Sequence, residues 1–160
     1  MRLESYSMPH ESEDLVLYAL LHDVEKGFYI DVGANDPTFM SVTKLFYDRG
    51  WHGINIEPVD IYCKKLEMMR PRDINLCVGC GSENGQAFMY DVKEKGLLGV
   101  VTFSDKVKDK NWNAKLLNGN LDDPEKYRRK DPTPILTLSE ISRQYCPPPP
   151  RIKSTSAKLM

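Results

Sequence analysis

Gly27-Phe-Tyr-Ile-Asp-Val-Gly-Ala-Asn-Asp36 joins an apolar run of strand-forming residues to a polar turn. We predict a buried strand that ends at Asp31 and Val32 and continues into a turn at Gly33. In an open α/β sheet, ligands bind outside the carboxyl ends of the strands, and a glycine there lets a ligand approach the backbone. The alternative is a strand followed by an ordinary Gly/Asn turn.

Strand and helix patterns alternate around this stretch. We expect a helix capped by Ser12 before it, then a helix from Asp36 to Gly50, a strand at 53–57, a helix from Asp60 and a strand at 73–78. The apolar residues expected to face the core from these helices are Leu15, Val16, Ala19, Leu20, Phe39, Val42, Leu45, Phe46, Ile61, Leu66 and Met69. This alternation predicts a parallel βαβαβ unit of the α/β class.

The pattern changes after residue 85. Strand-like runs at 87–90 and 97–103 predict an antiparallel hairpin, and the mixed-charge stretch 104–131 is interpreted as a solvated loop, with a lid over the site as the alternative. A strand is expected at 134–138, followed by a helix that Ser139 caps. We expect one domain at residues 1–146 and a proline-rich, disordered tail at 147–160.

Composition limits the classes of protein. The chain has 160 residues, 41% of them hydrophobic and 28% charged, which is typical of one soluble domain. A formal charge of -1 gives no electrostatic reason for nucleic acid as a partner. Because no apolar run is long enough to span a membrane and no signal-like segment begins the chain, we expect a cytoplasmic protein.

The four cysteines are Cys63, Cys77, Cys80 and Cys146. Cys77 and Cys80 have the spacing of a metal or redox pair, but a second close pair is lacking and turn residues follow. We therefore expect structural, reduced cysteines and no metal site.

A candidate ligand follows from three residues. A dinucleotide fingerprint counted from Gly33 would need glycines where Asn35 and Thr38 stand, so a nicotinamide or flavin cofactor is disfavoured. Glu57 ends the second strand at about the 20-residue distance at which an acid binds ribose hydroxyls; its alternative role is that of a surface carboxylate. S-adenosylmethionine fits best, because it offers a ribose to Glu57, an amino-acid end to the Gly33 turn and a sulfonium to Asp31.

Several ordered segments together carry a family resemblance. They are Ser5-Tyr-Ser7, Glu13-Asp-Leu15, residues 27–35, Ser41-Val-Thr43, residues 50–58 and residues 70–76. In this order they resemble the FkbM-type S-adenosylmethionine-dependent methyltransferases, over residues 5–91 and more weakly over 134–145. The resemblance implies a Rossmann-like methyltransferase fold and methyl transfer to a hydroxyl of a sugar, glycolipid or polyketide-like natural product.

The resemblance also implies roles for single residues. Asp31, Gly33, Ala34 and Asn35 would hold the methionine part of the cofactor, Glu57 with Pro58 the ribose, and Val78 with Gly79 would lie near the adenine. Ser41 and Thr43 belong to the pattern, but packing and helix capping explain them equally well. His52 is interpreted as a strand-entry residue. No catalytic base is assigned; Asp36 is a candidate, although a helix cap is its favoured role.

The end of the chain departs from the family pattern. Family members continue past the Tyr145-like helix into a fourth core strand, whereas here Pro147 to Pro150 and a polar tail follow. We therefore expect an incomplete domain, a first strand with a bare edge suited to self-association, and little or no turnover by the chain alone. The alternative function is a truncated, catalytically inactive cofactor-binding module or remnant.

Overall fold

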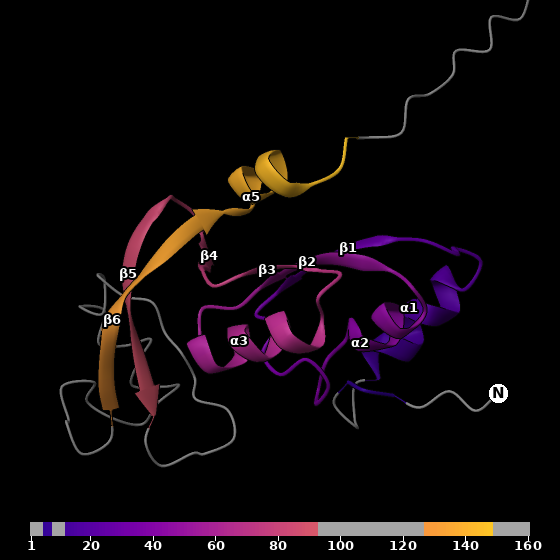
Figure 1. Ribbon diagram of the computed structural model, residues 1–160, viewed down its shortest axis with the longest axis horizontal. Coiled ribbons are helices and arrows are strands. Elements are labelled where there is room, and N and C mark those ends of the chain that lie inside the picture. Colours follow the sequence, from indigo (N-terminus) through magenta and orange to yellow (C-terminus); the bar gives the residue numbers. More distant parts are fainter. Residues whose placement is uncertain (1–4, 8–11, 93–126, 149–160) are drawn as a thin grey trace, which may run out of the picture.

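The computed structural model describes residues 5–7, 12–92 and 127–148, and its centre is a parallel sheet with helices on both faces (Figure 1). The sheet contains β1 (Phe28–Val32), β2 (His52–Ile56) and β3 (Ile74–Leu76) in the order β1-β2-β3, with both pairings parallel. The helices between them are α2 (Lys44–Asp48) and α3 (Asp60–Met69). The predicted α/β class and βαβαβ unit are confirmed, consistent with a Rossmann-like fold.

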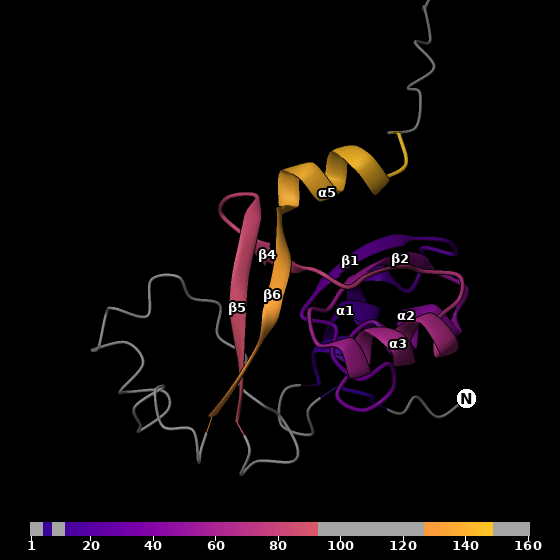
Figure 2. The same ribbon diagram turned by 60° about the vertical axis from the view of Figure 1, so that its left-hand side comes forward.

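The two faces of this sheet differ in chemistry, because successive side chains of a strand point to opposite faces. Ile54 and Ile56 are buried on one face, where they pack against Ile141 of α5 (Leu138–Tyr145). On the opposite face Asp31, Asn55 and Asn75 share one register row across the three strands. Figures 1 and 2 show α5 above the sheet, with α2 and α3 below it.

A second sheet has the strand order β4-β6-β5, with β4 (Gly79–Gly81) parallel to β6 (Tyr127–Thr137) and β5 (Gly85–Val92) antiparallel to it. The predicted hairpin partner of β5 was residues 97–103, which lie outside the described residues; among the described residues β5 pairs with β6. Residues 127–131, predicted as loop, belong to β6. The expected tail lies outside the described residues from 149 onward.

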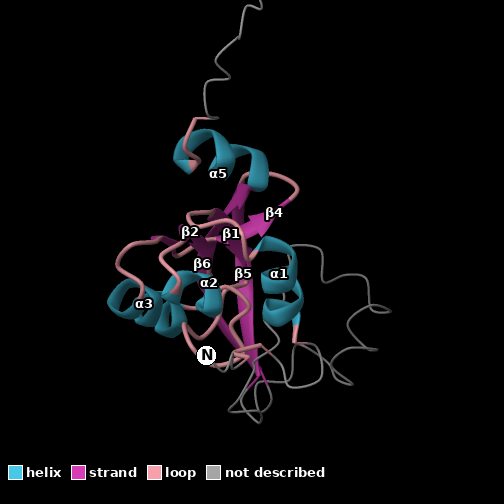
Figure 3. Ribbon diagram, turned by 90° about the vertical axis from the view of Figure 1, so that its right-hand side faces the viewer, coloured by secondary structure: helices cyan, strands magenta, loops and turns pink. Residues whose placement is uncertain are grey.

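Several predicted helix details were wrong. In α1 (Glu13–Leu21), Val16 and Leu20 are exposed rather than packed on the sheet, and Asp14 is the buried residue. The helix expected from Asp36 begins only at Lys44, although Gly50, at a φ of +92°, ends it as predicted. The other predicted core residues that are exposed are Ala19, Phe39, Ile61 and Met69. Figure 3 shows α1, α2 and α3 together on the side of the sheet away from α5.

Two caps also differ from expectation. Ser12 precedes α1 but has a left-handed backbone, with a φ of +46°, and its side chain makes no cap hydrogen bond. At α5 the cap is Thr137 rather than Ser139, because the Thr137 side chain accepts from the Glu140 N–H at 3.1 Å. The Thr137 hydroxyl, at the end of β6, therefore accepts from a backbone N–H group in the first turn of α5.

The cysteines were predicted to be reduced, and the structure corrects this for two of them. Cys63 of α3 forms a disulfide with Cys77, the residue that follows β3, with a Cα–Cα distance of 5.5 Å. Cys80 and Cys146 are free. Glu67 lies near the pair, so three possible ligand atoms fall within 4.8 Å of one another, but metal binding requires thiolates rather than a disulfide. None of the described helices has the length and apolarity needed to span a membrane.

Candidate functional site

The turn after β1 is held against the end of β2. The N–H groups of Gly33 and Ala34 donate to the Ile56 carbonyl oxygen at 2.9 and 3.2 Å. Gly33 has a φ of +78° and Asn35 a φ of +52°, so the turn passes twice through the left-handed region. A Cβ on Gly33 would meet nothing within 4 Å, so this glycine is required by the backbone conformation, and the space before it is open.

Glu57 connects this turn to the next one. Its Oε2 accepts from the Asn35 N–H at 2.8 Å, and its Oε1 accepts from the Val59 N–H at 2.8 Å. The Glu57 N–H donates to the Leu76 carbonyl oxygen at 3.0 Å. One acidic residue therefore joins the carboxyl ends of all three parallel strands.

Glu57 is not the surface carboxylate that was its alternative interpretation, because only 4% of the residue is exposed. Burial raises its pKa, and the nearby charge of Asp31 adds to that rise, while the two backbone hydrogen bonds lower it. Together these effects raise the pKa of Glu57 above its ordinary value. Each oxygen accepts one backbone hydrogen and keeps a second lone pair.

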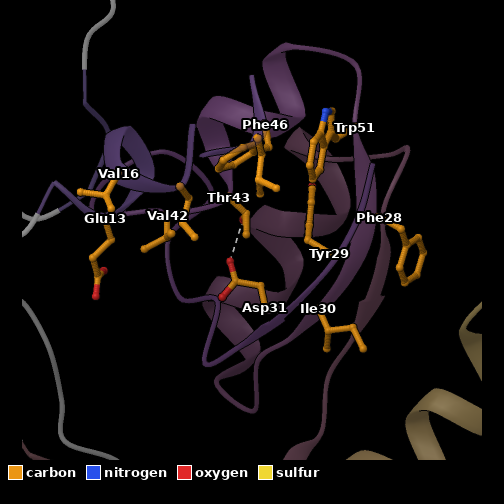
Figure 4. A pocket seen from close by; sticks show the side chains of 12 residues that line it. Glu13, Val16, Phe28, Tyr29, Ile30, Asp31, Val42, Thr43, Phe46 and Trp51 are labelled. Atoms are coloured by element: carbon orange, nitrogen blue, oxygen red, sulfur yellow. Dashed lines mark hydrogen bonds between the residues drawn. The ribbon is translucent and has the colours of Figure 1, made fainter. Parts of the chain in front are cut away.

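Asp31 lies on the face of β1 that points toward α2. Its Oδ2 accepts a hydrogen bond from the Thr43 Oγ1 at 2.6 Å, drawn as a dashed line in Figure 4. Burial raises the pKa of Asp31, the Thr43 hydrogen bond and the Arg70 charge lower it, and Asp73 raises it further. Together these effects raise the pKa of Asp31 above its ordinary value.

A cavity of about 670 Å³ lies beside β1, between α1 and α2 (Figure 4). Its walls are mostly apolar, and Asp31 and Thr43 are among its polar residues. The lining residues are Glu13, Val16, Leu17, Leu21, Phe28, Tyr29, Ile30, Asp31, Val42, Thr43, Phe46 and Trp51. Within the described ranges β1 pairs only with β2, and the cavity borders this strand edge.

The remaining predicted cofactor residues lie at the same edge of the sheet or just beyond it. Pro58 stands between Glu57 and Val59 and is half-buried. Val78 packs against the apolar cluster around Ile54. Gly79 was expected in a loop, but it begins β4 and pairs with Ile135, so the chain after β3 enters the second sheet.

The other pattern residues have identifiable structural partners. Asp36 Oδ1 accepts from the N–H groups of Thr38 and Phe39, each at 3.0 Å, and Oδ2 accepts from Lys65 at 2.9 Å. Although burial opposes it, these contacts lower the pKa of Asp36. Asp36 therefore holds a turn rather than a helix start. His52 is exposed at the first position of β2, as predicted.

Sequence reasoning missed a buried polar group beneath the site. Asp73 accepts from the Tyr29 hydroxyl at 2.6 Å, the Gly53 N–H at 2.9 Å and Asn55 Nδ2 at 2.9 Å. Among buried side-chain polar atoms of the described residues, only Asn55 Oδ1 has no hydrogen-bond partner. The period-two alternation of polar residues in β1, β2 and β3 was the available signal.

Arg70 was also missed, although only 1% of it is exposed. It follows α3 and carries hydrogen bonds to Pro37, Ser41 and Thr43. A basic residue at a helix C-terminus is ordinarily a solvated cap, so nothing in the local sequence marks Arg70 as buried.

The buried Glu57, the half-buried Asp31, an open glycine turn and an adjacent cavity suit a ligand with cationic groups and hydroxyl donors. Carboxylates attract ammonium and sulfonium groups, and lone pairs such as those of Glu57 accept from hydroxyls. These acidic hydrogen-bond acceptors and the open turn therefore fit the cofactor that the sequence suggested.

Comparison with known proteins gives one match. A family model described as the methyltransferase FkbM domain matches residues 31–148. Neither the curated proteins nor the solved structures yield a significant match.

Proposed function

Since the chain belongs to the FkbM methyltransferase family, we propose that it is built to transfer a methyl group to a hydroxyl oxygen of a sugar, glycolipid or polyketide-like natural product. Members of this family use S-adenosylmethionine. The cofactor supplies a methyl group already activated on a sulfonium, so the protein mainly aligns the acceptor and receives its proton.

One observation supports the cofactor site above all others: the 2.8 Å hydrogen bond from the Asn35 N–H to Glu57 Oε2. These residues are far apart in the sequence and were assigned to neighbouring parts of one ligand, the methionine and the ribose. Their contact places the glycine turn and the acid at one edge of the sheet, where α/β proteins bind ligands.

We assign the cofactor contacts from this arrangement. The Asp31–Asn35 turn would hold the methionine part, with the Asp31 carboxylate near its positive charge. Glu57 and Pro58 would border the ribose, because Glu57 keeps lone pairs after accepting from Asn35 and Val59. Val78 and Gly79 would lie toward the adenine.

The proton acceptor for the substrate hydroxyl is not assigned. Asp36 already accepts from two backbone N–H groups and from Lys65, and its pKa is lowered. An anion stabilised in this way is a poor base, so its contacts support a structural role.

Calorimetry with S-adenosylmethionine and S-adenosylhomocysteine tests the assignment. We expect both to bind the full chain, and Glu57→Gln to weaken binding about tenfold or more, because the amide disturbs the Asn35 or Val59 contact and removes the charge. Glu67→Gln is the control, since Glu67 is an exposed acid on α3. Absence of binding by the wild-type chain at millimolar cofactor would contradict the proposal.

The second candidate is a cofactor-binding module without turnover. The open edge of β1 favours it, because among residues 5–7, 12–92 and 127–148 no strand covers that side of the site. A methyl-transfer assay with sugar hydroxyl acceptors separates the two candidates. Cofactor binding without product supports the module, and single-turnover methylation supports the enzyme.

A further inference from the structure

Arg70 places a positive charge under the cofactor turn. Its Nε and Nη2 donate to the Pro37 carbonyl oxygen at 3.1 and 2.6 Å, Nη2 donates to Ser41 Oγ at 2.6 Å, and Nη1 donates to Thr43 Oγ1 at 2.7 Å. Because the guanidinium remains charged and is almost fully buried, its charge acts through a medium of low polarity.

The direction of the hydrogen bonds through Thr43 is fixed by chemistry. A guanidinium only donates, so Thr43 Oγ1 accepts from Arg70 and its own hydrogen is free to point elsewhere. That hydrogen reaches Asp31 Oδ2, 2.6 Å away. Two hydrogen bonds therefore connect these residues in one direction: Arg70 donates to Thr43, and Thr43 donates to Asp31. We call this chain of hydrogen bonds the relay.

The relay acts on one oxygen of Asp31. No described residue donates a hydrogen bond to the other oxygen, Oδ1, and Asp31 lines the cavity shown in Figure 4. A carboxylate with one oxygen fixed by the protein has a defined orientation and retains acceptor capacity for a ligand.

We propose that Arg70 and Thr43 are positioning residues that hold the Asp31 carboxylate ionised and in one orientation for the cationic end of the cofactor. This proposal rests on the proposed function for the identity of the ligand. The relay itself, from Arg70 to Asp31, stands on the hydrogen bonds alone.

The need for such a relay follows from the other groups around Asp31. Glu57 and Asp73 are acids whose charges interact with it, Glu13 of α1 lines the same cavity, and Tyr29 is the neighbouring titratable residue on its face of β1. Burial and the Asp73 charge favour the protonated form of Asp31, whereas the Thr43 hydrogen bond and the Arg70 charge favour the ionised form. Only the ionised form attracts a cation.

The test compares Thr43→Val with Thr43→Ser. Valine has the shape of threonine but lacks the hydroxyl, while serine keeps the hydroxyl and loses a methyl group. We expect Thr43→Val to raise the pKa of Asp31, measured by carboxyl-carbon NMR titration without cofactor, and Thr43→Ser to stay near wild type.

Calorimetry at several pH values provides the second measurement. We expect Thr43→Val to bind S-adenosylhomocysteine, which keeps the ammonium group, about tenfold more weakly, with the loss growing as the pH falls. Thr43→Ser should recover most of the affinity. A merely structural Thr43 would lower the stability of both variants without moving the pKa of Asp31.

Two outcomes would overturn the relay: an unchanged Asp31 pKa in Thr43→Val, or a serine variant that shifts the pKa as far as valine does. If the wild-type chain bound no cofactor, the proposed function would fail, while the titration of Asp31 in the free protein would still decide the relay. Amide NMR spectra of both variants establish that they are folded.

Discussion

At residue 33, the backbone conformation itself requires glycine. Its φ of +78° belongs to the left-handed region, which costs a residue with a side chain about 1–2 kcal/mol. The added Cβ would nevertheless meet nothing within 4 Å. Conformation, rather than crowding, therefore selects glycine at the turn after β1.

We predict that Gly33→Ala lowers the free energy of unfolding by about 1 kcal/mol, measured by urea denaturation. Gly85→Ala is the matched control, because its Cβ also meets nothing within 4 Å and its φ is not positive. An equal loss in both variants would show that the left-handed turn is not the cause.

Asp14 is a second residue whose role the structure defines. The carboxylate accepts from the hydroxyls of Ser5 and Ser7, each at 2.7 Å, and from the N–H groups of Tyr6 and Leu15 at 2.6 and 2.9 Å. Burial alone would raise its pKa, but these hydrogen bonds lower it overall, below the ordinary value of 3.8. Asp14 thereby ties the N-terminal segment to α1.

The lowered pKa fixes the sign of a pH effect. A carboxyl group with a lower pKa when folded stabilises the fold above its unfolded pKa, and that contribution is lost as the pH falls toward the folded pKa. We predict that Asp14→Asn lowers the free energy of unfolding by about 1–3 kcal/mol at pH 7. The free energy of unfolding of this variant should also fall less than that of the wild type as the pH is lowered. Asp23→Asn is the control, because the Asp23 side chain is 88% exposed. Parallel pH profiles for Asp14→Asn and wild type would contradict this role.

At the scale of elements, α3 is attached to the sheet through its N-terminal half. Its first turn follows the Glu57–Val59 contact, and the disulfide from Cys63 connects the helix to the residue after β3. The cross-link joins residues 14 positions apart, a loop for which chain-entropy estimates give about 3 kcal/mol.

We predict that Cys63→Ser lowers the thermal midpoint under non-reducing conditions and that a reductant lowers the wild-type midpoint toward it. Cys80→Ser should keep the reductant response of the wild type, because Cys80 is free. Thiol counting on the denatured, unreduced chain gives an independent check: two reactive thiols are expected from four cysteines, and four would contradict the disulfide.

At the scale of the molecule, the described part of the parallel sheet ends in two edge strands, β1 and β3, and the β1 edge borders the cavity. Among the described residues β3 lies beyond β2, α5 covers the apolar face, and β1 forms an edge. Exposed residues near this edge include Val16 and Val32. Unpaired strand edges beside apolar surface favour pairing with another chain.

We therefore predict that the chain self-associates as its concentration rises, measured by sedimentation velocity. Val32→Lys should shift the population toward monomer, because a lysine on an edge strand opposes edge pairing. Leu138→Lys is the control, since Leu138 is an exposed apolar residue of α5 on the far face of the sheet. A monomeric wild type at all concentrations, or equal effects of both variants, would contradict edge pairing.

The sequence by itself determined the parallel βαβαβ unit, the glycine turn and its partner acid. Strand and turn residues at 27–36 and 53–58 carry local signals, namely strand-forming apolar residues, a turn glycine and a proline, that need no distant neighbour. Asn35 and Glu57 then meet because parallel strands end at the same edge of a sheet.

Only the tertiary structure decided which residues are buried and which charges interact. Apolar periodicity predicted a buried face for α1, yet Val16 and Leu20 are exposed, because a helix buries a face only where another element covers it. Arg70 is buried, and its charge reaches Asp31 through Thr43, a contact between residues from three different elements or their ends. The disulfide between Cys63 and Cys77 likewise depends on how close the two residues lie in space, which local patterns do not encode.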